Sequence, residues 1–192
     1  MEIVLKGLKT TIVGRSIFYH RTLPSTMDLA KKLATEGVQE GTVVLCDEQT
    51  EGRGRQKRKW FASPASSILM SVVFRPTLGQ LPQNNMLGSL SIVRAIERLT
   101  EIKSTVKWPN DVLVDGRKVA GILMENILQG EALQAAILGV GLNVSLDVSS
   151  YPEISSIATS LSAQAGRDFK RDDVLRTLLE EKDTLNQAVK RN

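Results

Sequence analysis

Two charged side chains on a predicted β-hairpin are the first candidates for chemistry in this sequence. The Asp-Gly pair at 115–116 lies between β-forming residues, which favours a two-residue turn because both central residues need positive φ. Such a turn places Asp111 opposite Ala120 and on the same face as Lys118. Gly121 leaves the backbone bare just past the lysine, which suits an anionic ligand. The site interpretation competes with a plain surface ion pair.

A second charged stretch is EQTEGRGRQKRKWFASP at 48–64, which holds five basic residues within the seven from Arg53 to Lys59. Its glycines allow close backbone approach, and arginine binds phosphate through bidentate, charge-assisted bonds. We interpret the stretch either as a loop that closes over a nucleotide phosphate or as a nucleic-acid contact in which Trp60 stacks on a base. A solvated charged loop is the third interpretation, because a short Gly-rich string has many false positives.

The bulk composition excludes several classes of protein. The single Cys46 rules out a disulfide framework and a cysteine metal cluster, and its apolar surroundings predict a buried structural thiol. The single His20 disfavours a multi-histidine metal site and a Ser-His-Asp hydrolase. The net charge of +4 favours anionic ligands only weakly. No window resembles a transmembrane span or a signal peptide, so we expect a cytoplasmic protein.

Apolar periodicity predicts a mixture of strands and helices along 192 residues. Helices are expected at 26–35 with Ser25 as N-cap, at 84–99 and at 172–190. Strands are expected at 3–5, 12–13, 17–19, 42–47, 67–75, 118–125 and 132–142. The Ser-rich residues 149–170 are expected to form a turn or short helix. This order predicts an α+β fold, a mixed and mostly antiparallel sheet packed with helices. The common Gly-rich dinucleotide and phosphate-loop motifs are absent.

These motifs together resemble the catalytic domain of biotin protein ligases, the biotin–[acetyl-CoA-carboxylase] ligases. The resemblance rests on 48–64, on KWPNDVLVDGRKVAGILME at 107–125 and on ILGVGLNV at 137–144, and it runs from about Ser25 to about Leu179. It implies one class II synthetase-like catalytic domain over residues 1–192, with its core at about 18–180. It also leads us to expect neither an N-terminal DNA-binding domain nor the family's C-terminal β-barrel.

The resemblance implies a two-step reaction, in which biotin and ATP give biotinyl-5′-AMP and a carrier-protein lysine then takes the biotinyl group. The catalytic residues it implies are Lys118, Arg55 and Asp111. The biotin-binding residues it implies are Ser25, Thr26, Gln49, Gly52, Arg53, Lys118 and Gly121. The ATP- or adenylate-binding residues it implies are Arg55, Arg58, Trp60, Lys107, Asn110 and Asn143. Mg²⁺ would accompany ATP with Asp111 as a possible ligand and no dedicated metal cluster.

One residue departs from the family pattern, because Met27 stands where the family has an amide side chain at the start of the biotin site. The implied partner is the biotin carrier domain of a biotin-dependent carboxylase, with a possible homodimer and with neither nucleic acid nor membrane as a partner. Two alternatives stay open. One is a non-catalytic module that binds biotin or biotinyl-AMP, and the other is a relative that handles lipoate or octanoate.

Overall fold

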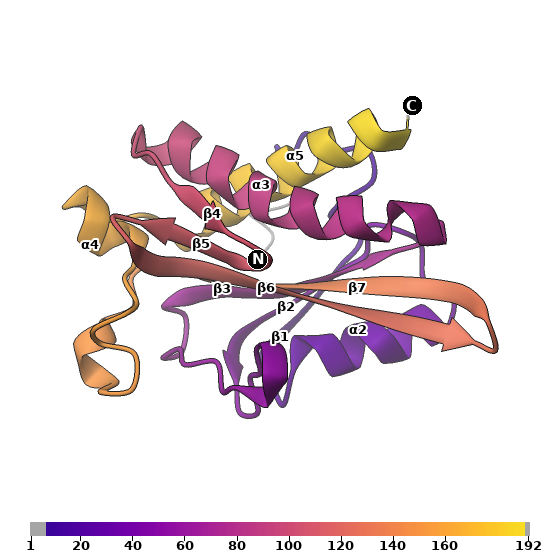
Figure 1. The fold of residues 1–192 in the computed structure, drawn as a ribbon, viewed down its shortest axis with the longest axis horizontal. Helices are drawn as coiled ribbons and strands as arrows, with labels where there is room; N and C mark the ends of the chain where they lie inside the picture. The colour runs from indigo at the N-terminus through magenta and orange to yellow at the C-terminus, as the bar shows by residue number, and fades with distance from the viewer. Residues whose placement is uncertain (1–6, 191–192) are drawn as a thin grey trace.

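A computed structural model describes residues 7–190 and shows one seven-stranded sheet with helices on both faces (Figure 1). The strands are β1 (Ile17–Leu23), β2 (Val43–Gln49), β3 (Ser67–Phe74), β4 (Thr105–Lys107), β5 (Asp111–Val114), β6 (Arg117–Gln129) and β7 (Ala132–Asn143). The α-helices are α2 (Thr26–Thr35), α3 (Leu81–Thr100), α4 (Leu161–Ala165) and α5 (Arg171–Lys190). Short 3₁₀ turns are η1 (Arg55–Lys57), η2 (Leu78–Gln80) and η3 (Val148–Ser150). The strand predicted at 3–5 lies outside the described residues, and 12–13 belongs to a turn rather than a strand.

The strands follow the order β1-β2-β3-β7-β6-β5-β4 across the sheet. Among the seven described strands, only the β1–β2 pair is parallel, and every other neighbouring pair is antiparallel. The predicted α+β class with a mixed, mostly antiparallel sheet is therefore confirmed. No helix among residues 7–190 is both long and apolar enough to cross a membrane.

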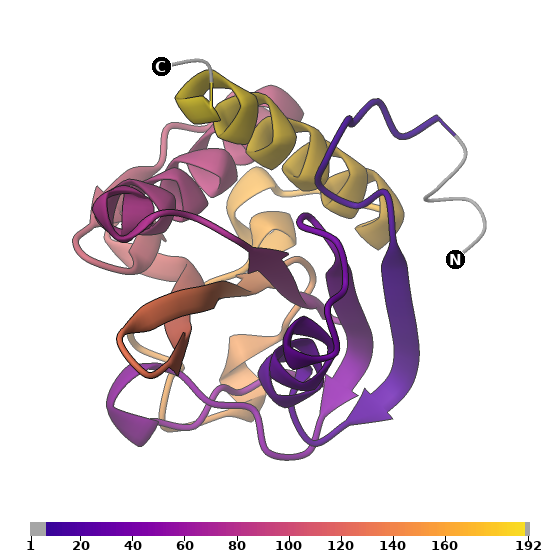
Figure 2. The same cartoon turned by 90° about the vertical axis from the view of Figure 1, so that its right-hand side faces the viewer.

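Successive side chains of the central strands point to opposite faces of the sheet, and each face packs into its own hydrophobic core. In β7, Leu138, Val140 and Leu142 face the core under α3 and α5. Ala135 and Ile137 face α2 on the opposite side. Figures 1 and 2 show α3 and α5 together over one face and α2 alone over the other. Because α2 covers only part of its face, the remainder is available for a site.

The hairpin register differs from the prediction beyond the first two pairs. Leu113 lies opposite Lys118 as expected, but the register then shifts, and Asp111 lies opposite Gly121 rather than Ala120. The reason is a β-bulge that lets the consecutive residues Val119 and Ala120 both enter the α3–α5 core, where each is fully buried. Ala120 therefore leaves the face on which it was predicted. Gly121 takes its place beside Lys118 and Asp111.

Candidate functional site

The floor of the site is backbone without side chains. Gly121 of β6 and Gly141 of β7 lie directly opposite each other in the register. The Trp60 ring rests on both, because a Cβ added at Gly141 would lie 2.4 Å from its Cζ2 atom and one at Gly121 would lie 3.0 Å from its Cζ3 atom. A Cβ at Gly139 would likewise lie 2.7 Å from the Met27 sulfur. These glycines are therefore required for the close packing of the site's own side chains.

The predicted pair of charges is present on this face. Lys118 Nζ lies 2.6 Å from Asp111 Oδ1 and 5.3 Å from the centroid of the Trp60 ring. The main chain of Lys118 is held on its outer side, since its N–H donates to the Ile157 carbonyl and its carbonyl accepts from the Thr159 N–H, both at 2.8 Å. The lysine thus has a fixed backbone, while its half-buried ammonium group faces the pocket.

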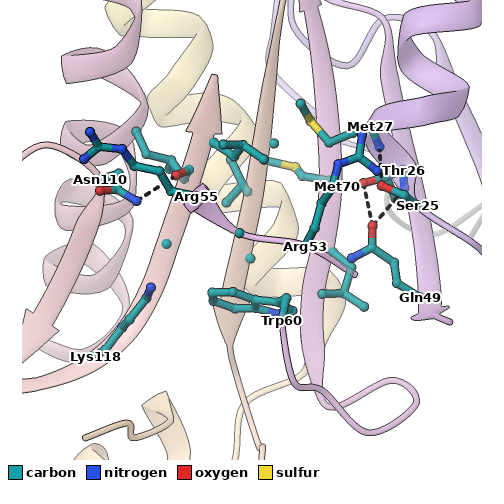
Figure 3. Close-up of a pocket in the computed structure, with 18 residues that line it drawn as sticks. Ser25, Thr26, Met27, Gln49, Arg53, Arg55, Trp60, Met70, Asn110 and Lys118 are labelled. Atoms are coloured by element: carbon teal, nitrogen blue, oxygen red, sulfur yellow. Dashed lines mark hydrogen bonds between the residues drawn. The ribbon is translucent and has the colours of Figure 1, made fainter. Parts of the chain in front are cut away.

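A polar corner lies at the start of α2, on the other side of Trp60 (Figure 3). Ser25 is the N-cap, and its side chain accepts from the Met27 N–H, as predicted. Gln49 Oε1 accepts from the Thr26 N–H at 2.8 Å and from its hydroxyl at 3.0 Å, and the Thr26 hydroxyl is also 2.8 Å from the Ser71 hydroxyl. The oxygen of Gln49 is therefore occupied, which leaves its amide N–H groups as donors for a ligand.

Two adjoining hollows share the residues at the centre of the site. The first has an empty volume of about 470 Å³ and is lined by Ser25, Thr26, Met27, Gln49, Arg53, Gly54, Arg55, Trp60, Leu69, Met70, Asn110, Lys118, Gly121, Ile122, Leu123, Gly139, Val140 and Gly141. The second has an empty volume of about 930 Å³ and is lined by Gly54, Arg55, Gln56, Arg58, Lys59, Trp60, Phe61, Asn110, Asp111, Lys118, Asn143, Ile154, Ile157 and Ala158. Both volumes include space open to solvent. Trp60 and Lys118 line both hollows, so one ligand can run from one into the other.

The basic stretch forms a small hairpin above this floor. The Trp60 N–H donates to the Gly52 carbonyl at 2.9 Å, and the Gly54 N–H donates to the Arg58 carbonyl at 2.7 Å. Arg53 is directed to carboxylates outside the hollow, although it also lines it. Its guanidinium makes two hydrogen bonds to Asp28, and these bonds hold the pKa of Asp28 below its usual value.

Three of the residues predicted to bind a ligand are either outside the two hollows or already hydrogen-bonded within the protein. Gly52 does not line either hollow but lies behind the wall, where a Cβ would be 3.1 Å from Gln49 Nε2. Lys107 is exposed on β4 and lines neither hollow. Asn143 lines the second hollow, but its amide is engaged, accepting from the Ser67 hydroxyl at 3.4 Å and donating to the Thr159 carbonyl at 3.0 Å.

The sequence did not predict that the segment after β7 forms one wall of the second hollow. Ile154, Ile157 and Ala158 come from the Ser-rich segment, which was expected to be only a turn or short helix. No local motif marks them, because the segment is brought beside β6 by its backbone bridge to Lys118. The thiol prediction is confirmed, since Cys46 is buried and burial raises its pKa to about 12.

The described residues contain no group of three or more His, Cys, Asp or Glu side chains that could hold a metal ion by itself. Among the residues that the structure describes, Asp111 is the only carboxylate that lines either hollow. One carboxylate fits a Mg²⁺ that keeps its waters and binds chiefly to nucleotide phosphates. A dedicated protein cage for a metal is not built here among residues 7–190.

Comparison with known proteins identifies the family to which this chain belongs. A model of the biotin/lipoate A/B protein ligase family matches residues 19–143, and the chain belongs to this family. It is 39% identical to the bifunctional ligase/repressor BirA of Bacillus subtilis over 176 residues, which covers 90% of this chain and 54% of that protein. It is also 39% identical to the biotin–[acetyl-CoA-carboxylase] ligase of Paracoccus denitrificans over 124 residues, covering 62% and 51% of the two chains.

The solved structures agree with the sequence relatives. The biotin protein ligase of Aquifex aeolicus in complex with biotin and ATP superposes with a TM-score of 0.81 at 31% identity, covering 93% of this chain and 73% of that one. The predicted resemblance is therefore confirmed. The chain spans about half the length of the curated relatives that it matches.

Proposed function

We propose that this chain catalyses ATP-dependent biotinylation of a carrier-protein lysine through biotinyl-5′-AMP. The observation that carries the proposal is the junction of the two hollows, where Lys118 and Trp60 line both. A ligand with an acid at one end and a nucleotide at the other would have its reacting atoms at this junction. Family membership and the biotin- and ATP-bound relative from Aquifex aeolicus support the same assignment.

The first hollow suits the biotin half. A ureido group has two N–H donors and one carbonyl acceptor, so it needs both donors and acceptors in the protein. We assign the carbonyl to the free N–H groups of Gln49 and the ureido N–H groups to the hydroxyls of Ser25 and Thr26. Leu123 and Val140 supply apolar wall for the rest of the molecule. The departure at Met27 fits this arrangement, because its side chain is buried against Gly139.

The second hollow suits the nucleotide half. Arg55 and Arg58 provide guanidinium groups for the phosphates, and Phe61 adds a further aromatic wall beside Trp60. Asn110 lines the junction, and the engaged amide of Asn143 fixes the wall of the nucleotide pocket. Lys107 lines neither hollow, so we assign it to ATP only if the bound phosphates extend beyond the second hollow.

Asp111 is the residue of this pocket that would hold Mg²⁺, and the ion would neutralise phosphate charge when bound. In the first step an oxygen of the biotin carboxylate attacks the α-phosphorus of ATP, and the bond to the bridging oxygen breaks to release pyrophosphate. The ammonium of Lys118 stabilises the charge that grows on the oxygens around phosphorus, which is where binding energy accelerates the reaction. Its ion pair with Asp111 holds the ammonium at the junction.

In the second step the neutral amine of the carrier lysine attacks the acyl carbon of the mixed anhydride. The bond between that carbon and the phosphate oxygen breaks, AMP leaves, and the amine loses its proton as the amide forms. Asp111 is our candidate for orienting the amine, because its carboxylate faces the junction from β5. The carrier domain of a carboxylase is the proposed protein substrate, as the name of the Paracoccus denitrificans relative suggests. A homodimer and a cytoplasmic location complete the proposal, with neither nucleic acid nor membrane as a partner.

Pyrophosphate–ATP exchange tests the proposal directly. We expect labelled pyrophosphate to enter ATP only when Mg²⁺ and biotin are both present, and lipoate or octanoate not to replace biotin. Exchange driven by lipoate instead would identify a lipoate-handling relative. Tight biotin binding without exchange would identify a binding module and contradict the enzymatic proposal.

A further inference from the structure

Arg53 is the centre of a chain of alternating charges at the edge of the first hollow. Its Nη1 and Nη2 atoms lie 2.9 and 2.6 Å from the two carboxylate oxygens of Asp28, and Nη2 lies 3.5 Å from Glu125 Oε2. Glu125 in turn pairs with Lys31. A bidentate arginine–carboxylate pair inside such a network has a defined geometry, unlike most surface ion pairs. These ion pairs connect the first turn of α2, strand β6 and the basic hairpin.

The Arg53–Asp28 pair can affect Trp60 because Arg53 lies in the hairpin that leads to Trp60. Arg53 pairs with Lys59 across the hairpin, between the hydrogen bond that joins Gly52 to Trp60 and the one that joins Gly54 to Arg58. The arm that carries Arg53 is therefore bonded at both ends to the arm that leads into Trp60. A restraint on Arg53 would therefore act on both arms of the hairpin, including the arm that leads into Trp60.

Trp60 is held by packing contacts and by the Lys118 ammonium above its ring, but not by a side-chain hydrogen bond among the described residues. Its indole Nε1 is buried and has no hydrogen-bond partner among the described residues. The ring is positioned by packing on the glycine floor and by the hairpin backbone. Asp28 lines neither hollow, and its side chain is 53% exposed, so its hydrogen-bonded link to the site is Arg53, which lines the first hollow.

We propose that Asp28 is a positioning residue that holds Arg53, keeps the 52–60 hairpin over the first hollow and thereby slows release of the bound ligand. The part that concerns the ligand rests on the proposed function. For a ligase of this kind the retained ligand would be the reactive adenylate, which must outlast the arrival of the carrier. Because the pair is partly exposed, its strength should fall as salt concentration rises.

Hydrogen exchange on the ligand-free protein tests the positioning claim without any assumption about function. Asp28→Asn keeps the size of the side chain and removes its charge. Glu36→Gln is the matched control at the C-cap of the same helix, where Glu36 Oε1 lies 3.9 Å from Lys32 Nζ. We expect the amides of Gly54 and Trp60 to exchange about fivefold faster in Asp28→Asn, a change of the size expected for the loss of one well-formed charged pair. Glu36→Gln should leave these rates unchanged.

A double-mutant cycle separates the pair from a general loosening of the helix. In an Arg53→Met background, Asp28→Asn should accelerate exchange no further, because its partner is already absent. Raising NaCl to 1 M should accelerate exchange in the wild type and have little effect in Asp28→Asn. Equal exchange in Asp28→Asn and the control, or an unchanged effect of Asp28→Asn without Arg53, would overturn the proposal.

Ligand release is then measured with biotin as the probe, by chasing labelled biotin from each protein with an excess of unlabelled biotin. We expect release about fivefold faster from Asp28→Asn than from the wild type or the control, with a thermal unfolding midpoint close to that of the wild type. Faster exchange without faster release would overturn the ligand part of the proposal. Failure of the wild type to bind biotin would refute the proposed function and the ligand part together, while the exchange result would still decide the positioning claim.

Discussion

A buried lysine in α5 allows a prediction whose size can be worked out from the structure. Lys182 is 1% exposed, its ammonium lies 4.4 Å above the centroid of the Phe74 ring, and it has no hydrogen-bond partner among the described residues. Burial lowers its pKa from 10.5 to about 8, although the nearby charges of Glu40 and Asp183 act in the opposite direction. The folded protein therefore carries an unfavourable buried charge at neutral pH.

The perturbation that removes this charge is Lys182→Met, which keeps a flexible chain of similar length. Lowering a pKa from 10.5 to about 8 corresponds to roughly 3 kcal/mol, because each pKa unit is worth about 1.36 kcal/mol. The penalty is fully present below pH 8 and disappears as the pH rises from 8 to 10.5, since the lysine then loses its proton in the folded protein before it would in the unfolded chain. The variant should thus be about 2 to 3 kcal/mol more stable than the wild type at pH 7, and nearly equal to it at pH 10.5.

Urea denaturation at several pH values between 7 and 10.5 measures this difference. Comparing the two proteins at each pH cancels the titration of all other groups. Lys32→Met, which removes an exposed lysine of α2, is the control and should change stability by less than about 0.5 kcal/mol at every pH. A Lys182→Met variant that is less stable at pH 7, or a difference that does not change with pH, would refute the reasoning.

Three further predictions concern the glycine floor, the N-terminal segment and the thiol. Gly141→Ala should weaken biotin binding about tenfold, because its Cβ would lie 2.4 Å from the Trp60 ring and displace it; titration calorimetry measures the loss, and unchanged affinity would contradict the packing described. Asp183→Asn should cost about 1.5 to 3 kcal/mol in urea denaturation at pH 7, since the carboxylate accepts three backbone N–H groups from residues 11–13. Burial alone would raise the Asp183 pKa, but these bonds keep it below 3.8, so the contribution should be lost as the pH falls below that value, and a cost under about 0.5 kcal/mol at pH 7 would count against it. Cys46, whose pKa burial raises to about 12, should react with a thiol reagent at pH 8 only after unfolding; rapid labelling of the native protein would be inconsistent with its burial.

Much of the fold could be read from periodicity and capping. The helix predicted at 26–35 has these bounds in the structure, and its N-cap Ser25 is confirmed by the hydrogen bond to Met27. Such features depend on neighbouring residues, so local sequence is enough to predict them. The Asp-Gly turn likewise set the first pairs of the hairpin correctly.

Features that depend on distant residues could not be read in this way. The bulge near Val119 follows from the burial of two successive residues under α3 and α5, which no local pattern reveals. The pairing of Arg53 with Asp28 joins residues 25 positions apart on different elements. The Trp60 ring packs on Gly141, which belongs to a different part of the chain. In each case tertiary packing decided a detail on which the site depends.

The proposed mechanism depends on Lys118, whose ammonium stabilises the phosphoryl-transfer step at the junction of the two hollows. The most direct test is biotin-dependent pyrophosphate–ATP exchange in Lys118→Ala, with Arg117→Ala as a matched control, because Arg117 is the preceding exposed residue of the same hairpin and lines neither hollow. We expect Lys118→Ala to lose at least a hundredfold in exchange rate, a loss typical of removing one group that stabilises the transition state, while still binding biotin. Arg117→Ala should retain the wild-type rate. Equal exchange in Lys118→Ala and the wild type would contradict this role of Lys118.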